Sequence, residues 1–264
     1  MSHQGPPFTD MIALISSVPE EGALLARQLK RKTLLAGKPV YKGRINNKAV
    51  VHITSGMGKT NAAHAATILL EKFSPEMLVL FGIGGAYPSA GLTIGDIVVA
   101  EKEVYGDEGV MLKDEFHGTE FIGIPLLRKR RRNYFNEFPL DKPLIRRAKN
   151  ILSPLFFCPP SENQGKKGLK EKRGECKIQS GTFVTVSTCT GTVKKALELE
   201  KRFGALCENM EGASVAHVCA MYDTPVIEIR GISNIVSNRD KHKWDIRFAA
   251  ANCREAVIAL LKNL

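Results

Sequence analysis

Short runs of β-branched and aliphatic residues recur along the chain and alternate with amphipathic segments. Uninterrupted apolar runs are typical of strands buried on both faces of a sheet. The predicted strands are Met11–Ser16, Ala49–Thr54, Met77–Phe81, Asp96–Ala100, Gly181–Ser187 and Pro225–Arg230. The predicted helices are Glu20–Arg31, Lys59–Phe73, Thr192–Phe203, Gly212–Tyr222 and a closing helix from Ile246 to Leu260. This alternation predicts one α/β domain over residues 10–264, with a mainly parallel or mixed central sheet flanked by helices and a site at the carboxyl ends of the strands.

Residues 128–178 interrupt this order. They hold five prolines and then a polar run with three glycines, so we expect a helix-bearing excursion followed by a loop. The stretch carries fifteen Lys/Arg against five Asp/Glu, a net +10 of the chain's +11. The basic run Arg128–Arg132 leaves a nucleic-acid-binding module as a remote alternative, but such a run is more typical of a solvated surface. We therefore expect no nucleic-acid partner.

Composition narrows the class of protein further. The chain has 264 residues, of which 44% are hydrophobic, enough to bury a sizeable core. It has no membrane-spanning apolar run and begins without a signal-peptide pattern, so we expect a cytoplasmic protein with no membrane partner. Its six cysteines form no C-x-x-C pair and have no histidines at metal-ligand spacing. This predicts reduced thiols, no metal site and no disulfide framework.

One segment ends like a phosphate-binding loop, with Gly58 followed by Lys59 and Thr60. The full motif requires a glycine five residues before Gly58, and Ile53 occupies that position. We therefore interpret the segment as a strand, a glycine turn and a helix start, and expect no nucleotide cofactor.

Three further segments are candidates for chemistry. Phe81–Ala86 is glycine-rich and follows an apolar strand, and a glycine turn there would let backbone amides approach a ligand. Glu208–Ala213 has two carboxylates at a strand-to-helix junction, where burial would be costly, although the start of a surface helix also explains them. Glu228 and Arg230 lie in an apolar strand that leads to Ser233-Asn234, and a charged pair in that context indicates a site.

Six segments, taken in order, resemble the nucleoside phosphorylase and nucleosidase superfamily. They are Val18–Leu25, Ser55–Lys59, Gly82–Gly85, Gly91–Val98, Asn209–Gly212 and Arg230–Ser233. Each is weak alone, but their order and approximate spacing follow the family over nearly the whole chain outside 128–178. The resemblance implies the α/β fold predicted above, a small-molecule nucleoside substrate, no cofactor, and assembly as a homo-oligomer.

The resemblance also implies roles for individual residues. Glu21 would polarise the attacking water, a task that suits a carboxylate. Glu211 would accept hydrogen bonds from the ribose 2′- and 3′-hydroxyls, and Met210 would pack against the sugar. Phe183 would stack on the purine, while the backbone at Val184 would read the edge of the base.

The resemblance also implies roles for Arg230, Ser233 and the Gly-rich segment. Arg230 matches a position near the nucleophile, where its charge would orient Glu21, and Ser233 would support the residue that follows it. The Gly-rich segment, as Ile83, Gly84 and Gly85, would approach the substrate with its backbone.

The amino-terminal strand distinguishes hydrolase from phosphorylase. Phosphorylases of this superfamily carry a Gly-Asp-Pro-type loop with an arginine there, because phosphate is held by amides and guanidinium groups. This chain has Ser16–Glu21 instead, and an anionic Glu21 would repel phosphate. Water is the expected nucleophile, with a 6-oxopurine nucleoside phosphorylase as an alternative.

Asn234 stands where 5′-methylthioadenosine/S-adenosylhomocysteine nucleosidases carry an aspartate. An asparagine amide can donate to O6 and N7 of a 6-oxopurine, whereas an aspartate would face O6 with like charge. Asn234–Asp240 and Lys243–Ile246 are similar to the futalosine hydrolase branch, which serves menaquinone synthesis and acts on a 6-oxopurine nucleoside with a carboxyphenyl group at its sugar end. The resemblance therefore implies hydrolysis of futalosine to hypoxanthine and dehypoxanthine futalosine; a methylthioadenosine/adenosylhomocysteine nucleosidase is the alternative.

The sequence offers no single candidate for protonating the leaving base or for binding the substrate carboxylate. Asn234 cannot supply a proton, so help for the leaving group would come from hydrogen bonds to the developing charge, from Asp240 or from water. The substrate carboxylate needs a cation, for which Arg239 and Lys243 are the candidates.

Overall fold

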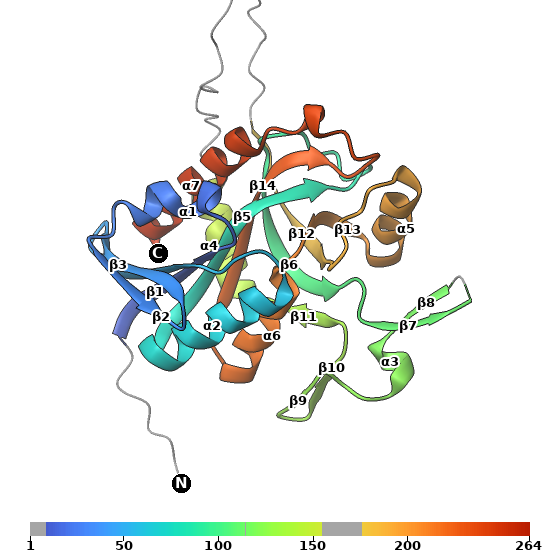
Figure 1. The fold of residues 1–264 in the computed structure, drawn as a ribbon, viewed down its shortest axis with the longest axis horizontal. Helices are drawn as coiled ribbons and strands as arrows, with labels where there is room; N and C mark the ends of the chain where they lie inside the picture. Colours follow the sequence, from blue (N-terminus) through green and yellow to red (C-terminus); the bar gives the residue numbers. More distant parts are fainter. Residues whose placement is uncertain (1–8, 114, 155–175) are drawn as a thin grey trace, which may run out of the picture.

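The computed structural model describes residues 9–113, 115–154 and 176–264. Its main strands are β1 (Thr9–Ser16), β2 (Arg31–Leu35), β3 (Lys38–Ile45), β4 (Lys48–Thr54), β5 (Pro75–Ala86), β6 (Ile97–Tyr105), β11 (Glu137–Pro139), β12 (Ile178–Thr185), β13 (Ala205–Asn209) and β14 (Val226–Ile235). They form one mixed ten-stranded sheet in the order β11-β6-β12-β13-β5-β1-β4-β3-β2, and β14 pairs with both β5 and β6 (Figure 1). The predicted α/β fold is confirmed.

The pairing directions gather strand ends on one edge of the sheet. Strands β4, β1, β5 and β14 run parallel to one another, so their carboxyl ends lie together. Strand β14 also pairs antiparallel with β6, while the end of β5 pairs antiparallel with β13. Strands β5, β13, β12, β6 and β14 therefore close into a ring, and several chain segments converge where β5 and β14 end.

Helices cover the sheet in two groups (Figure 1). Helices α1 (Pro19–Ala26) and α4 (Lys142–Leu152) both pack against α7 (Ile246–Asn263), whereas α2 (Lys59–Phe73) packs against α6 (Gly212–Tyr222). The alanines of α2 that face the sheet are fully buried, because small side chains let the helix approach closely.

Helix α5 (Val193–Phe203) has a capping residue at each end. The Thr192 side chain accepts a hydrogen bond from Lys195 N–H at 3.3 Å, which caps the first turn. Gly204, with φ of 58°, ends the helix in the left-handed conformation.

The prediction of a long first helix is wrong. Helix α1 ends at Ala26, and Arg31–Leu35 instead forms β2, which pairs antiparallel with β3 at the edge of the sheet. Most of β2 is exposed, so it lacks the apolar run by which a buried strand is identified. The predicted helix therefore extended to Arg31, the first residue of β2, and the strand itself was not predicted.

The first half of the 128–178 excursion belongs to the domain. Strands β9 (Leu127–Lys129) and β10 (Arg132–Tyr134) form a hairpin, β11 pairs with β6, and the expected helix is α4. The expected loop falls mostly at 155–175, outside the described residues. A smaller arm of β7 (Gly109–Leu112), β8 (Glu115–Gly118) and α3 (Thr119–Ile122) precedes this region.

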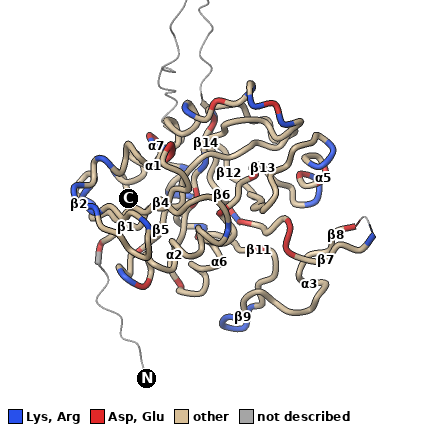
Figure 2. The backbone as a smooth tube through the Cα atoms, viewed as in Figure 1, with Lys and Arg blue, Asp and Glu red and all other residues tan. Residues whose placement is uncertain are grey.

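Two residues of the basic run in the β9–β10 hairpin contact the end of α6. Figure 2 shows its basic residues gathered at the tip of the hairpin. Lys129 Nζ donates to the carbonyl oxygens of Ala220 (2.7 Å) and Met221 (2.6 Å), at the end of α6. Lys129 and Arg130 also pair with Asp223, at 3.0 and 3.1 Å. Cations at a helix carboxyl end satisfy free carbonyls and oppose the helix dipole, so part of the run stabilises α6.

Two further findings bear on the composition. Within the described ranges, no helix is long and apolar enough to span a membrane. Cys189, Cys207, Cys219 and Cys253 are free thiols as expected, but Cys176 is disulfide-bonded, which corrects the prediction for that residue.

Candidate active site

A cavity of about 230 Å³ lies at the carboxyl ends of β1, β5 and β14. All but two of the predicted site residues line it, namely Glu21, Ile83, Gly84, Gly85, Met210, Glu211, Arg230, Ser233 and Asn234. A second cavity of about 360 Å³, lined by residues of α4, β12 and α7, contains none of them. In the part of the chain that the structure describes, no three or more His, Cys, Asp or Glu side chains gather as a metal site would require.

Four hydrogen bonds hold the carboxylate of Glu21 against the cavity. Its Oε2 accepts from the backbone N–H and the hydroxyl of Ser17, both at 2.8 Å, and from Val18 N–H at 3.1 Å. Its Oε1 accepts from Ile83 N–H at 2.9 Å. Three of these donors are backbone amides and cannot turn away. The Ser17 hydroxyl can rotate, so it is the contact that a bound water can replace.

The glycine-rich segment is the last part of β5, not a turn. A side chain at Gly82 would lie 2.4 Å from Oε1 of Glu21, and one at Gly84 would lie 2.4 Å from Sγ of Cys207. Because Gly82 has no side chain, the Glu21 carboxylate can approach this strand and accept from Ile83 N–H.

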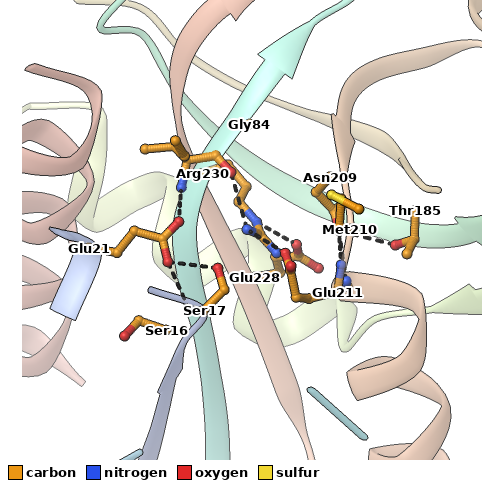
Figure 3. A network of polar contacts seen from close by, with 12 residues as sticks. Ser16, Ser17, Glu21, Gly84, Thr185, Asn209, Met210, Glu211, Glu228 and Arg230 are labelled. Carbon is orange, nitrogen blue, oxygen red and sulfur yellow. Dashed lines mark hydrogen bonds and ion pairs between the residues drawn. The ribbon is translucent and has the colours of Figure 1, made fainter. Parts of the chain in front are cut away.

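Glu211 lies just before α6, and each of its carboxylate oxygens accepts a hydrogen bond; Figure 3 shows the side that faces Arg230. Its Oε1 accepts from Gly58 N–H at 2.9 Å, and its Oε2 accepts from Arg230 Nη1 at 3.3 Å. Gly58, with φ of 94°, adopts a backbone conformation that favours glycine, which confirms the predicted strand, turn and helix start. Each oxygen of Glu211 keeps a lone pair for a ligand in the cavity.

Arg230 is a buried cation with carboxylates around it. Nε donates to Glu228 Oε1 at 2.8 Å, and Nη1 also donates to the Ile83 carbonyl at 3.1 Å. Burial opposes its charge, but the nearby Glu228, Glu211 and Glu21 carboxylates raise the pKa of Arg230 above its ordinary value. Its hydrogen bonds go to Glu228, Glu211 and Ile83 rather than to Glu21, so any effect on Glu21 is exerted through charge.

Asn234 and Glu208 flank the same glycine. In the sheet, Gly85 lies opposite Asn234 on β14 and opposite Glu208 on β13. With neighbouring strands about 4.8 Å apart, the two Cα atoms are about 10 Å from each other. The Val236 side chain lies beside Gly85, 2.7 Å from where a Cβ atom would stand. Ser233 Oγ donates to Asn234 Oδ1 at 2.8 Å, and within the described residues Asn234 Nδ2 has no partner. An amide donor and a carboxylate acceptor thus line the same cavity from the two strands on either side of Gly85.

Glu208 was noted in the sequence but not assigned to the site. It is buried, which raises the pKa of its carboxyl, while hydrogen bonds from Thr190 and Tyr87 oppose that rise. Thr190 N–H donates to Oε1 at 2.9 Å, and the hydroxyls of Thr190 and Tyr87 donate to Oε2 at 2.5 and 3.2 Å. A carboxylate inside a strand, preceded by a buried cysteine, was the available signal; the start of a surface helix was the wrong explanation for it.

Phe183 and Val184 do not line the cavity. Both side chains are fully buried, Phe183 in the main core and Val184 in a smaller cluster. The wall on that side is formed by Cys189 and Thr190, a few residues further along the chain. No feature of the sequence singles these two out, because they lie in a loop without periodicity.

The candidates for binding the substrate carboxylate and for proton donation lie in the loop after β14, and they differ in whether they line the cavity. Arg239 and Trp244 line the cavity, and the Arg239 guanidinium lies 5.0 Å from the centre of the Trp244 ring. Lys243 does not line it, and pairs with Asp240 at 3.7 Å. Asp240 accepts from His242 N–H and is also outside the lining.

Comparison with known proteins agrees with this architecture. Residues 11–264 match the family model described as the phosphorylase superfamily. The chain belongs to the phosphorylase superfamily. This confirms the family resemblance that the six sequence segments indicated.

Relatives within the superfamily carry two names. A futalosine hydrolase of Thermus thermophilus is 35% identical over 231 residues, covering 86% of this chain and 89% of the relative. A 5′-methylthioadenosine/S-adenosylhomocysteine nucleosidase of Oceanobacillus iheyensis is 28% identical over 258 residues, covering 96% of this chain and 99% of the relative. The solved structure of the nucleosidase of that name from Neisseria meningitidis, in complex with methylthio-immucillin-A, superimposes with a TM-score of 0.78 at 23% identity, covering 97% of this chain and all of the other. Both curated relatives are hydrolytic enzymes by name, and this chain is accordingly an enzyme of the superfamily.

Proposed function

We propose that this enzyme hydrolyses the N-glycosidic bond of futalosine and releases hypoxanthine. The observation that carries the proposal is the pair of groups on either side of Gly85. Asn234 has its amide oxygen engaged by Ser233, so its NH₂ group is the part left for a ligand. Such a donor suits O6 and N7 of a 6-oxopurine, and Glu208 can accept from N1–H on the other side. A 6-aminopurine has no N1–H and presents a donor where Asn234 donates.

Water is the nucleophile in this proposal. Glu21 and Glu211 place two carboxylates in the cavity, and the buried Arg230 is already paired with Glu211 and Glu228. A phosphate dianion would meet this negative charge, because Arg230, the cation that lies among these carboxylates in the described residues, is already paired. A water that replaces the Ser17 hydroxyl would donate to Glu21 Oε2 and attack the anomeric carbon as positive charge develops on the sugar.

The sugar and the base would be held by separate groups. Glu211 accepts from the 2′- and 3′-hydroxyls through lone pairs that its protein partners leave open, and Met210 packs against the ribose. Charge that develops on the leaving base is stabilised by the Asn234 amide. Asp240 lies outside the cavity lining, so water is the proton source in this proposal. Phe183 and Val184 would act on the base only through the packing of the wall behind it.

Hypoxanthine release from futalosine in phosphate-free buffer tests this function. Parallel reactions with 5′-methylthioadenosine and inosine identify what the enzyme selects. The proposal predicts efficient cleavage of futalosine without phosphate, and weak cleavage of both comparison substrates. A strict need for phosphate would show a phosphorylase, and a strong preference for 5′-methylthioadenosine would show the activity by which several relatives are named.

Replacing Asn234 with aspartate should weaken the preference for a 6-oxopurine. We expect kcat/KM for futalosine to fall about 10- to 100-fold, because one donor to the base is lost and a charge faces O6. Cleavage of the 6-amino analogue of futalosine should rise relative to it. Asn238→Asp is the control, because Asn238 is exposed in the same loop and does not line the cavity. An unchanged ratio between the two substrates would remove Asn234 from base selection.

Arg239 is the cation we assign to the substrate carboxylate. It lines the cavity, is held against Trp244, and within the described ranges has no ion pair, whereas Lys243 lies outside the lining. Arg239→Met should raise KM for futalosine about 10- to 100-fold, the loss expected for a charge-assisted contact. Inosine, which lacks the carboxylate, should show no such change, and Lys243→Met should affect neither substrate. Equal losses with inosine would contradict the assignment.

A further inference from the structure

Two carboxyl groups lie buried beneath the site, outside the cavity lining. Glu103 is on β6 and Glu228 on β14, and each side chain is at most 1% exposed. Both press against the start of α6: a side chain at Gly212 would lie 2.0 Å from Glu103 Oε1 and 2.4 Å from Glu228 Oε2. Because both oxygens approach the same point, they lie no more than 4.4 Å apart, the sum of 2.0 and 2.4 Å. Two buried carboxylates this close would repel strongly if both were charged, so the arrangement favours one proton held between them.

The other partners of the pair indicate which group carries the proton. Glu228 accepts from the Arg230 guanidinium at 2.8 Å, a contact that favours the anion. Among the described residues, Glu103 accepts from two neutral donors, the Thr185 hydroxyl (2.7 Å) and the Asn209 amide (2.6 Å). Burial and the neighbouring Glu228 raise the pKa of Glu103 well above its usual range. The proton therefore belongs on Glu103, and the charge on Glu228.

Two routes lead from this pair to Glu211. Through Glu228, the Arg230 fork is fixed at Nε while Nη1 donates to Glu211 Oε2 (Figure 3). Through Glu103, the Asn209 amide is fixed, and its Oδ1 accepts from the backbone N–H of Glu211 at 2.9 Å and of Gly212 at 2.7 Å. One route positions the carboxylate of Glu211 and the other its backbone.

We propose that Glu103 and Glu228 are positioning residues that share one proton, with neutral Glu103 donating to anionic Glu228 and the anion aligning Arg230 and Glu211. Neither residue touches substrate. The effect on catalysis rests on the proposed role of Glu211 at the ribose, whereas the shared proton does not. The two parts are therefore tested separately.

Glutamine variants at the two positions test the asymmetry of the pair. Glu228→Gln removes the anion, and kcat/KM for futalosine should fall about 100-fold or more as Arg230 loses its alignment. Glu103→Gln replaces a neutral acid by a neutral amide that can still donate to Glu228, so its loss should stay within about 10-fold. Equal losses in the two variants, or a larger loss in Glu103→Gln, would overturn the assignment of the proton.

A double variant separates positioning from general damage to the fold. If Glu228 acts through Glu211, then adding Glu228→Gln to Glu211→Gln should cost less than about 3-fold further activity. An undiminished further loss would show that Glu228 acts elsewhere.

The proton itself can be observed without any substrate. Infrared spectra of the wild-type protein at about pH 8 should show the carbonyl stretch of a protonated buried carboxylic acid, far above the usual pKa of glutamate. The band should disappear in Glu103→Gln and persist in Glu208→Gln, which removes a different buried carboxyl whose pKa is also raised by burial. A wild-type protein without such a band refutes the shared proton even if neither variant folds. A band in an enzyme that does not cleave futalosine would leave the pair intact and reject the proposed substrate.

Discussion

Replacing Glu21 with glutamine is expected to lower kcat for nucleoside hydrolysis about 10²- to 10⁴-fold, the range for loss of a general base. The amide is close in shape to the carboxylate, but its NH₂ group would face donors on one side: the Ser17 and Val18 amides or Ile83 N–H. It can neither accept a proton from water nor stabilise the positive sugar. Substrate should still bind, because Glu211 and Asn234 are unchanged, so the loss should appear in kcat more than in KM.

The neighbouring residue offers a matched control. Glu20 precedes Glu21 on α1, is exposed and does not line the cavity, so Glu20→Gln should retain full activity. Both variants should unfold at similar temperatures. A Glu21→Gln enzyme with normal kcat would mean that the carboxylate only holds the loop between β1 and α1, and the nucleophile would then have to be activated by another group.

The main strands of the sheet could be predicted from the sequence because strands buried on both faces consist of uninterrupted apolar residues. The apolar runs at β1, β4, β5 and β14 are buried on both faces, and their order predicted where the strand ends would converge. The edge strand β2 is mostly exposed and polar, so it has no such apolar run. It forms because it can pair with β3, a relation between two segments that neither shows alone.

Some residues of the candidate site could likewise be predicted from the sequence, and others could not. Glu211, just before α6, and Asn234, near the end of β14, were predicted from the family resemblance, and the fold brings both to the same cavity because strand ends converge there. Phe183 was misplaced because a residue inside a strand faces either core or cavity according to the register of the strand, and this one faces the core. Glu208 and Glu103 are held by partners from distant segments of the chain, so their burial became visible only in three dimensions.

Replacing Arg230 with methionine should have the largest effect on stability, a loss of about 3–5 kcal/mol in the free energy of unfolding. The cation is 1% exposed and neutralises Glu228 and Glu211, so the variant leaves buried carboxylates without their partner. Urea denaturation at about pH 8 measures the loss. Arg239→Met removes an exposed guanidinium from the same cavity and should change stability by less than about 0.5 kcal/mol.

The pH dependence of that loss distinguishes unpaired charge from a simple packing defect. Burial already raises the pKa of Glu228 in the wild-type protein, and without Arg230 it should rise further above the value near 4.5 in the unfolded chain. A carboxyl whose folded pKa is raised destabilises the protein as pH increases through the interval between the two values, because the folded state retains the proton longer. The deficit of Arg230→Met should therefore shrink between about pH 8 and pH 5 as its carboxyls take up protons. Acid also destabilises both proteins through His52, whose pKa burial lowers to about 4, but this contribution cancels in the difference between variant and wild type. A deficit that stays constant over this interval would mean that the lost guanidinium mattered for its volume and hydrogen bonds rather than for its charge.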